Sequence, residues 1–186
     1  MNYQIKNPDE LTDHKINHIL NLWEVPEWNE MTASDFRSFF KDSEFHFILD
    51  SEDEILAVIR LNLDFTLEIS GKKFSFAEAV GLVSAQEKKG YGSKLVQFFK
   101  DNLIQRNIES IGFCATDLRP FYQRCDIEIL ENKAKAILES TDNGWINSDD
   151  DDILIFNTSG EMIELLKGLG PEQNAYLIPK EQYNEL

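Results

Sequence analysis

Residues 87–93 read EKKGYGS, and their two lysines and two glycines suit a loop that holds an anion such as a phosphate. Glycine lets a ligand approach the main chain closely, and a helix that starts in such a loop points its positive end at the ligand. The NTPase phosphate loop needs G-x-x-x-x-G-K-[ST], which is absent, and Leu95 takes the third glycine position of the dinucleotide fingerprint. An ordinary strand-to-helix turn would also use glycine, so both interpretations stay open.

The segments on both sides of this loop would position it. Residues 55–83 predict two long strands joined by a turn at Gly71. After the loop, apolar residues at helical spacing predict an amphipathic helix of about four turns. Its apolar positions are Leu95, Val96, Phe99 and Leu103. A strand over SIGFCA (residues 110–115) and a short helix beginning near Pro120 follow.

The first fifty residues predict a short strand, two helices and another strand. MNYQIK is strand-like, and a helix is expected to start with Asn7 as its N-cap and Pro8 at its first position. A second short helix starts at Thr32, and from Glu44 the pattern becomes strand-like again.

The last third of the chain is less regular. KAKAILES (133–140) suits a strand or a helix, and TDNGWINSDDDD (141–152) predicts turns with a solvated acidic run. ILIFN (153–157) predicts a strand, SGEMIELLKGLG (159–170) a capped helix, and the tail from Pro171 a short strand with a frayed end. Together these elements predict one α/β (α+β) domain with a mixed, largely antiparallel central sheet flanked by helices.

The stretch AEAVGLVSAQEKKGYGSKLVQFFKDNLIQ (77–105), followed by LRPFYQRC (118–125), resembles the acetyl-CoA-binding core of the GNAT N-acetyltransferase superfamily. In that family a strand leads into a Q/R-x-x-G-x-G/A loop, a long helix, a strand, and a short helix that ends in a Phe-Tyr or Leu-Tyr pair. The order of the other elements agrees as well. The resemblance implies a GNAT-like domain over residues 1–157, with 158–186 as a carboxyl-terminal helix and tail extension of the same domain.

The resemblance implies acetyl-CoA as the acyl donor and assigns the residues that hold it. The strand around Leu82, Val83 and Ser84 would offer main-chain groups to the pantetheine arm, as a sheet edge does to an added strand. Backbone N–H groups of the loop would hold the diphosphate, so neither lysine need be essential. The loop residues are Lys88, Lys89, Gly90, Tyr91, Gly92 and Ser93. Both lysines could equally belong to a solvated loop.

Two residues are candidates for acetyl transfer to an amine. A primary amine is mostly protonated at neutral pH and must lose a proton before it attacks. Glu78 lies in an apolar strand where many family members carry a base, and apolar surroundings raise the pKa of a carboxylate. Tyr122 matches the family tyrosine that assists the departing CoA thiolate. Alternatively, Glu78 is a satisfied strand glutamate and Tyr122 packs the short helix onto the sheet.

Three positions depart from the family pattern. Glu87 stands where Gln or Arg usually begins the loop motif, Ala115 where many members have asparagine, and Asp126 begins the pair that replaces a common Gly-Phe. A non-catalytic acyl-CoA-binding or regulatory module on the same fold therefore stays an alternative. The carboxyl-terminal helix and tail could instead serve a homodimer or a protein partner.

Charge composition narrows the class of partner. The chain has 34 Asp and Glu against 18 Lys and Arg, a net charge of −16. An acidic surface repels nucleic acid and anionic lipid, and favours a cationic amine acceptor, either a small molecule or a peptide, although solubility explains the same charge. The sequence has neither an apolar stretch long enough to span a membrane nor a signal pattern, so we expect a cytoplasmic protein.

Residues that attract attention as metal ligands are better explained otherwise. His14 and His18 are four apart on a helix, but no third ligand is evident. Cys114 and Cys125 lack the spacing of a zinc site. Trp23 and Trp28 flank VPEW between the first helices, where we expect them to pack, with substrate selection as an alternative role.

Overall fold

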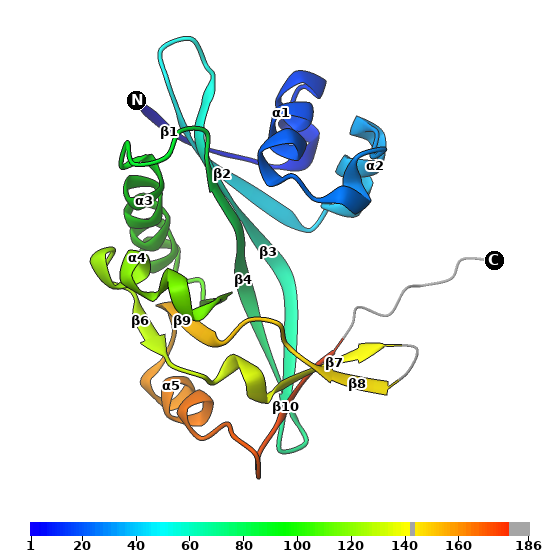
Figure 1. Ribbon diagram of the computed structural model, residues 1–186, viewed down its shortest axis with the longest axis vertical. Coiled ribbons are helices and arrows are strands. Elements are labelled where there is room, and N and C mark those ends of the chain that lie inside the picture. The colour runs from blue at the N-terminus through cyan, green and yellow to red at the C-terminus, as the bar shows by residue number, and fades with distance from the viewer. Residues whose placement is uncertain (142–143, 179–186) are drawn as a thin grey trace, which may run out of the picture. The chain divides into compact units, whose positions relative to one another are not determined.

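Two long strands, β3 (Ile55–Ile69) and β4 (Lys72–Ser84), meet at a tight turn and supply sheet to both parts of the chain (Figure 1). At the turn, Ser70 and Gly71 both have positive φ, as a two-residue hairpin requires. The computed structural model describes residues 1–141 and 144–178. Its contacts divide the chain into two units. The first comprises Met1–Leu63 and Glu78–Asn107, and the second Asp64–Ala77 and Ile108–Leu186.

In the first unit, successive side chains of a strand point to opposite faces of the sheet, and each face packs against helices. β1 (Asn2–Lys6) pairs with β2 (Ser43–Leu49), which pairs with β3, all antiparallel. On β2, Phe45 and Phe47 pack in a core with the first two helices, whereas His46 turns the other way and contacts Phe99 of α3 (Tyr91–Arg106). Helices therefore cover both faces of this sheet.

The two helices on one face start where polar side chains cap them. α2 (Ala33–Phe39) begins after Thr32, as predicted, with a capping box between Thr32 and Asp35. The predicted start of the first helix at Asn7 is wrong. Asn7 caps only a 3-10 turn, Pro8–Glu10, and α1 (Asp13–Trp23) starts after Thr12, whose side chain accepts from the Lys15 N–H. Between the two starts the backbone of Leu11 is extended and its side chain buried.

A polar network fixes α3 against β1 and β2 on the other face. Arg106 donates to both carboxylate oxygens of Glu44 at 2.6 and 2.8 Å, which lowers the Glu44 pKa to about 2. His46 is fully buried, and its Nδ1 is hydrogen-bonded to the Tyr3 hydroxyl at 2.6 Å. The helix that begins at the glycine loop is thus held at its opposite end.

The remaining strands all belong to the second unit. They are β5 (Ser110–Cys114), β6 (Glu128–Leu130), β7 (Ile137–Thr141), β8 (Gly144–Asn147), β9 (Asp152–Asn157) and β10 (Ala175–Leu177). With β3 and β4 they follow the sheet order β6-β9-β5-β4-β3-β10-β7-β8. β10 pairs antiparallel with β3 and parallel with β7, so both of its edges are paired within the chain. β5 pairs antiparallel with β9, as β6 does. Part of the predicted tail, residues 179–186, lies outside the described residues.

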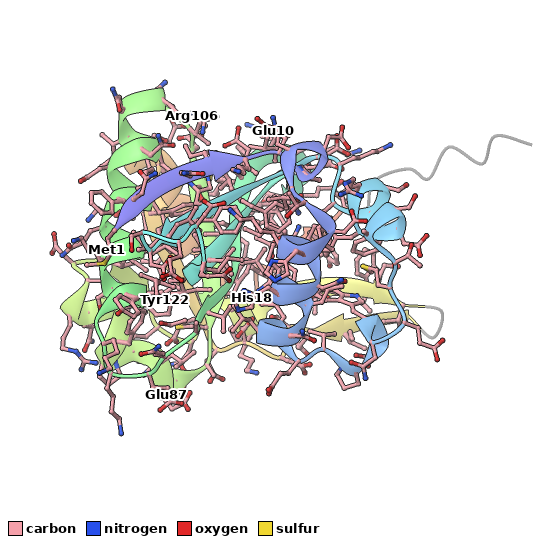
Figure 2. The ribbon with its side chains drawn as sticks, turned by 90° about the horizontal axis from the view of Figure 1, so that it is seen from above. Met1, Glu10, His18, Glu87, Arg106 and Tyr122 are labelled. Atoms are coloured by element: carbon pink, nitrogen blue, oxygen red, sulfur yellow. The ribbon has the colours of Figure 1, made fainter. Side chains whose placement is uncertain are left out.

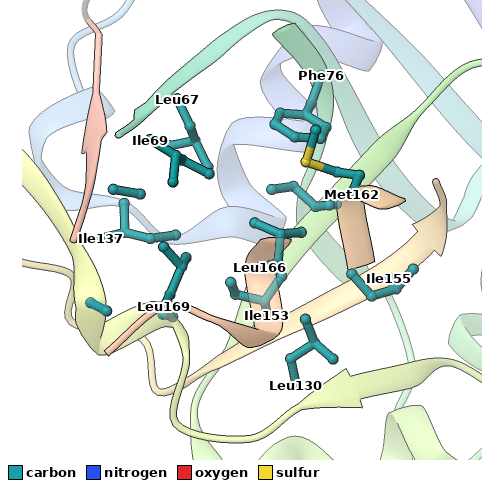
Figure 3. Close-up of a cluster of buried hydrophobic side chains, with 14 of the residues drawn as sticks. Leu67, Ile69, Phe76, Leu130, Ile137, Ile153, Ile155, Met162, Leu166 and Leu169 are labelled. Carbon is teal, nitrogen blue, oxygen red and sulfur yellow. The ribbon is translucent and has the colours of Figure 1, made fainter. Parts of the chain in front are cut away.

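The core of the second unit lies between this sheet and α5 (Gly160–Lys167) (Figure 3). Ser159 caps α5, accepting from the Met162 N–H, as the sequence predicts. Met162 and Leu166 are four residues apart, so they lie on one helix face, where they pack against strand side chains. The strand side chains of this cluster include Leu67, Ile69, Phe76, Ile137, Ile153 and Ile155.

The acidic run at Asp149–Asp152 is not the solvated segment that its composition predicts. Asp152 opens β9 and is fully buried, where it accepts hydrogen bonds from the Arg119 guanidinium and the Asn132 N–H. Asp151 accepts from the N–H and hydroxyl of Thr116. Part of the run therefore joins β9 to the segment around α4 (Arg119–Arg124) through charge-assisted hydrogen bonds.

Candidate active site

The first unit carries a local distortion of β4 at Gly81. Its φ is +68°, a left-handed value that inside a strand is typical of a bulge. The Gly81 carbonyl oxygen accepts a 2.7 Å hydrogen bond from Nε1 of Trp23, the last residue of α1. A Cβ at position 81 would lie only 2.9 Å from atoms of the Trp23 ring. Glycine is thus required twice, by the backbone angle and by the closeness of the indole.

A cavity of about 350 Å³ opens beside this distortion. Its walls come from the end of α1, the following segment, β3 and β4, and all of its residues belong to the first unit. Apart from Gly81, they are Leu22, Trp23, Val25, Trp28, Arg60, Val80, Leu82 and Val83. The sequence-predicted pantetheine contacts Leu82 and Val83 thus face a cavity that both tryptophans help to form.

Trp23 is the centre of an aromatic cluster that supports the cavity wall. Its ring lies 5.5 Å from the Trp28 ring and 5.7 Å from the Phe40 ring, between centroids. Aromatic pairs at these separations add to the stability that comes from buried area alone. The tryptophans therefore pack and line the cavity at the same time.

Glu78 lies on β4, two residues before Val80, and is half-buried. Its Oε2 accepts a 3.2 Å hydrogen bond from Nδ2 of Asn62 on β3. A carboxylate that accepts from an amide is stabilised in its charged form, which is the form that takes up a proton. The strand environment predicted for Glu78 is thus present, with a polar partner that the sequence pattern did not indicate.

The end of β4 is tied to the start of β3. The Ala85 N–H donates to the Leu56 carbonyl oxygen at 3.0 Å, and the Ser84 hydroxyl donates to Leu56 and Gln86 carbonyl oxygens. These bonds anchor the base of the glycine loop. The Ser84 side chain is therefore structural, and its predicted role as a main-chain contact to pantetheine stays a prediction.

The loop after Ser84 is exposed and turns twice through left-handed backbone angles. Lys88 has a φ of +59° and Gly90 a φ of +77°. A non-glycine residue in this region costs about 1–2 kcal/mol, so Lys88 stores local strain. Lys88, Lys89 and Glu87 are all exposed, and the Glu87 side chain points outward (Figure 2).

The loop leads directly into α3, and no side chain caps the first N–H groups of this helix. Gly90 is the N-cap, has no side chain to accept from them, and leaves open space where a Cβ would stand. The first turn contains no acidic residue. The N–H groups of Tyr91, Gly92 and Ser93 precede the first intrahelical bond, which runs from the Lys94 N–H to the Gly90 oxygen. This helix end can bind an anion such as a phosphate.

Tyr122 belongs to α4 of the second unit and is 7% exposed. Its ring packs edge-on against the Phe121 ring, with 4.9 Å between centroids, and against Phe156. Burial raises the pKa of the phenol, and negative charge on Cys114 or Cys125 would raise it further. The side chain is therefore an uncharged O–H donor at neutral pH.

The two cysteines are free and buried. Burial, with the nearby Asp152 and Asp150 carboxylates, raises the Cys114 pKa to about 12. Only a thiolate is strongly nucleophilic, so Cys114 is poorly suited to carry an acyl group.

Residues 1–141 and 144–178 contain neither a candidate metal site nor a candidate membrane span. No three His, Cys, Asp or Glu side chains there are grouped as a metal ion would need. No helix in the same ranges is both long and apolar enough to cross a membrane.

Sequence reasoning missed Gly81 and Arg60 as site residues. An isolated glycine inside the strand pattern AVGLV signals a bulge, and a lone arginine within the apolar run AVIRL signals a buried cation. Both signals are present in the sequence, but only the residues that surround Gly81 and Arg60 in the fold show that they lie at a cavity.

Comparison with known proteins identifies the fold. A family model described as the acetyltransferase (GNAT) family matches residues 13–127. A GNAT family N-acetyltransferase (YhbS) from Escherichia coli, solved in complex with CoA, has a TM-score of 0.58 at 12% identity and covers 100% of this chain and 92% of its own.

Two more solved structures share the fold at 14% identity. Escherichia coli ElaA has a TM-score of 0.53 and covers 83% of this chain and 99% of its own. An acyl-CoA N-acyltransferase from Pseudomonas aeruginosa has a TM-score of 0.52, with coverages of 83% and 97%. A search of curated proteins finds no match. The predicted mixed fold of the acyl-CoA N-acyltransferases is confirmed, and at these identities the solved structures show the fold alone.

We expect Gly81→Ala to destabilise the protein more than Gly71→Ala. Both glycines have positive φ, so each alanine costs about 1–2 kcal/mol of backbone strain. Only position 81 adds a clash with Trp23, worth roughly 1–3 kcal/mol more, because nothing lies within 4 Å of a Cβ at position 71. Urea unfolding of the two variants measures the difference, and equal losses would contradict a tight Trp23–Gly81 contact.

Proposed function

Because the chain belongs to the acetyltransferase (GNAT) family, we propose that it transfers an acetyl group from acetyl-CoA to a primary amine. Transfer is direct, within a ternary complex of protein, acetyl-CoA and an amine that is a small molecule or part of a peptide. The observation that carries this proposal is the uncapped start of α3 after Gly90, because it offers convergent N–H groups to a diphosphate.

The loop binds the diphosphate mainly through its backbone. The groups that contribute are the N–H groups between Lys88 and Ser93, with the left-handed angles at Lys88 and Gly90 turning the chain into α3. Lys88 and Lys89 add positive charge from an exposed position, where screening weakens it. The solved structure of YhbS in complex with CoA supports a CoA ligand for this fold.

The strand after the bulge receives the pantetheine arm and the thioester. A bulge leaves main-chain groups without ladder partners, so the groups of β4 near Leu82 and Val83 can bind an extended ligand. An N–H group aimed at the thioester oxygen stabilises the negative charge that develops when the amine attacks. The cavity beside Gly81 then holds the acceptor.

Glu78 takes the proton of the amine, directly or through water. A protonated amine cannot attack, and a half-buried carboxylate held by the Asn62 amide can serve as the base. Tyr122 assists the departing thiolate, since its phenol keeps its proton at neutral pH and can donate it. The high pKa of Cys114 supports direct transfer over an acyl-cysteine intermediate.

A second function on the same fold is acyl-CoA binding without catalysis, in a regulatory or interaction module. The observation that favours it is Glu87, an exposed carboxylate in the loop where a phosphate would bind. Binding and turnover experiments separate the two functions.

We expect acetyl-CoA to bind and Gly90→Ala to weaken that binding roughly tenfold, because a Cβ and a shift in φ would disturb the N–H groups before α3. Lys89→Ala should change affinity less than Gly90→Ala at 150 mM salt. Isothermal titration calorimetry measures both. No heat of binding at millimolar acetyl-CoA would contradict the proposed function.

We expect Tyr122→Phe to lower turnover by about a hundredfold, the typical contribution of a positioned acid, with nearly unchanged acetyl-CoA affinity. The Tyr122→Phe variant keeps the ring contacts with Phe121 and Phe156, so we expect it to fold as the wild type does. A check that it is folded is the control. Thiol release over a panel of amines gives the rate. An unaltered rate would remove Tyr122 from the mechanism.

We expect Glu78→Gln to reduce the rate most near neutral pH and least near pH 10. The acceptor is largely protonated at neutral pH and needs a base, whereas near its own pKa of about 10 much of it is already neutral. Rates of both proteins from pH 6 to 10 measure the gap. A gap that does not change with pH would assign proton removal to another group.

A further inference from the structure

The cavity beside Gly81 has one charged side chain in an otherwise apolar wall. Arg60 reaches it from β3, among the tryptophans, valines and leucines that make up the remaining surface. A volume of about 350 Å³ falls at the small end of the range for small-molecule sites, roughly 300–1,000 Å³. The cavity thus suits a compact ligand with an apolar body and one anionic group.

Arg60 is held in place but keeps most of its donors. Its Nη1 donates to the Ser43 hydroxyl at 3.2 Å, and its guanidinium carbon lies 4.8 Å from the Phe40 ring centroid. Within the described residues the bond to Ser43 is the one hydrogen bond of the guanidinium, which has five N–H donors. Burial lowers the pKa of Arg60, although an arginine stays charged at neutral pH. A planar cation in this setting favours a carboxylate.

A negative group stands close to Arg60. Glu78 interacts electrostatically with Arg60 and accepts a hydrogen bond from Asn62, which lies two residues after Arg60 on β3. Residues two apart on a strand point to the same face. The cavity is thus lined by one cation, Arg60, and an anion, Glu78, interacts with that cation, which matches the charges of a zwitterion.

We propose that the acceptor is an α-amino acid with an aromatic or branched apolar side chain. Its side chain fills the cavity between Trp23 and Trp28, its carboxylate binds Arg60, and its amine faces Glu78. The inference rests on the proposed function, and it differs from the cationic acceptor that the net charge favours, because Arg60 repels a second positive charge.

The reaction then balances as follows. The ammonium group gives a proton to Glu78, the neutral nitrogen attacks the thioester carbon, a C–N bond forms and the C–S bond breaks. The nitrogen is positively charged after the attack and loses a second proton to solvent. CoA leaves as a thiolate and takes a proton from water or from Tyr122, which is then reprotonated from solvent. The products are an N-acetyl amino acid, CoA and one proton released to solvent.

The decisive experiment compares L-phenylalanine, L-phenylalaninamide and spermidine by thiol release from acetyl-CoA. The amide has the size of the amino acid without its negative charge, and its amine is the more easily deprotonated, so a preference for phenylalanine must come from carboxylate binding. We expect kcat/KM to be about ten- to a hundredfold higher for phenylalanine, as a charge-assisted bond predicts.

Arg60→Gln should remove this preference, measured as the ratio of kcat/KM for phenylalanine to kcat/KM for the amide, while leaving the affinity for CoA nearly unchanged. Arg60→Lys keeps the charge without the planar fork and should retain part of the preference. Urea unfolding of both variants confirms that they are folded. Equal rates for phenylalanine and its amide, or a higher rate for spermidine, would overturn the inference and leave acetyl transfer intact.

Calorimetry separates the inference from the proposed function. If acetyl-CoA binds but no amine is acetylated, L-phenylalanine is titrated into the CoA-loaded wild-type protein and Arg60→Gln. If acetyl-CoA does not bind, the proposed function fails and the same titration is done on the free protein. Phenylalanine binding that Arg60→Gln weakens tenfold or more supports recognition of an amino acid by Arg60 in either case, and its absence overturns the inference.

Discussion

The contact between Trp23 and Gly81 is the constraint on which the first unit depends. The indole donates to the Gly81 carbonyl, and the ring lies so close that no side chain fits at position 81. This contact joins the end of α1 to a left-handed kink in β4. Because the kink and the indole each form a wall of the cavity, one hydrogen bond defines both the shape of the strand offered to a cofactor and the space beside it. Its loss would change both together.

Polar groups beneath the aromatic cluster are costly to fold. Arg60 and Glu78 lose hydration on burial, and a lone buried charge is strongly destabilising. The structure offsets this cost with Ser43 and Asn62, which hydrogen-bond to one charge each, and with the Phe40 ring beside Arg60. Apolar residues of similar size would stabilise such a site at least as well. A cation that lines a cavity and an anion that interacts with it therefore add no stability that apolar residues would not supply, and this agrees with the proposed ligand-binding role.

Local signals predicted most elements, and errors arose where tertiary contacts decide. The hairpin turn at Gly71, the caps at Thr32 and Ser159 and the helix after the glycine loop follow from a few adjacent residues. The prediction of where α1 starts was wrong because Asn7 and Thr12 are both good N-cap residues. Only the burial of Leu11 selects Thr12 as the cap of α1. The short strand β6 is paired by the distant strand β9, and buried Asp152 depends on Arg119, so composition alone could not reveal either feature. The short strand predicted in the tail is present as β10.

The candidate site divides along the same line. A diphosphate is bound by consecutive N–H groups, so the residues that hold it must be adjacent in the chain, and a seven-residue segment suffices to predict them. The cavity proposed for the acceptor is lined by side chains that converge from α1, β3 and β4, so no short segment encodes it. Arg60 and Gly81 were overlooked for this reason, although each is unusual in its own strand. The proposed cofactor site can thus be predicted from the sequence. The proposed acceptor site can be predicted only when the strand that carries Arg60 is placed beside the strand that carries Glu78.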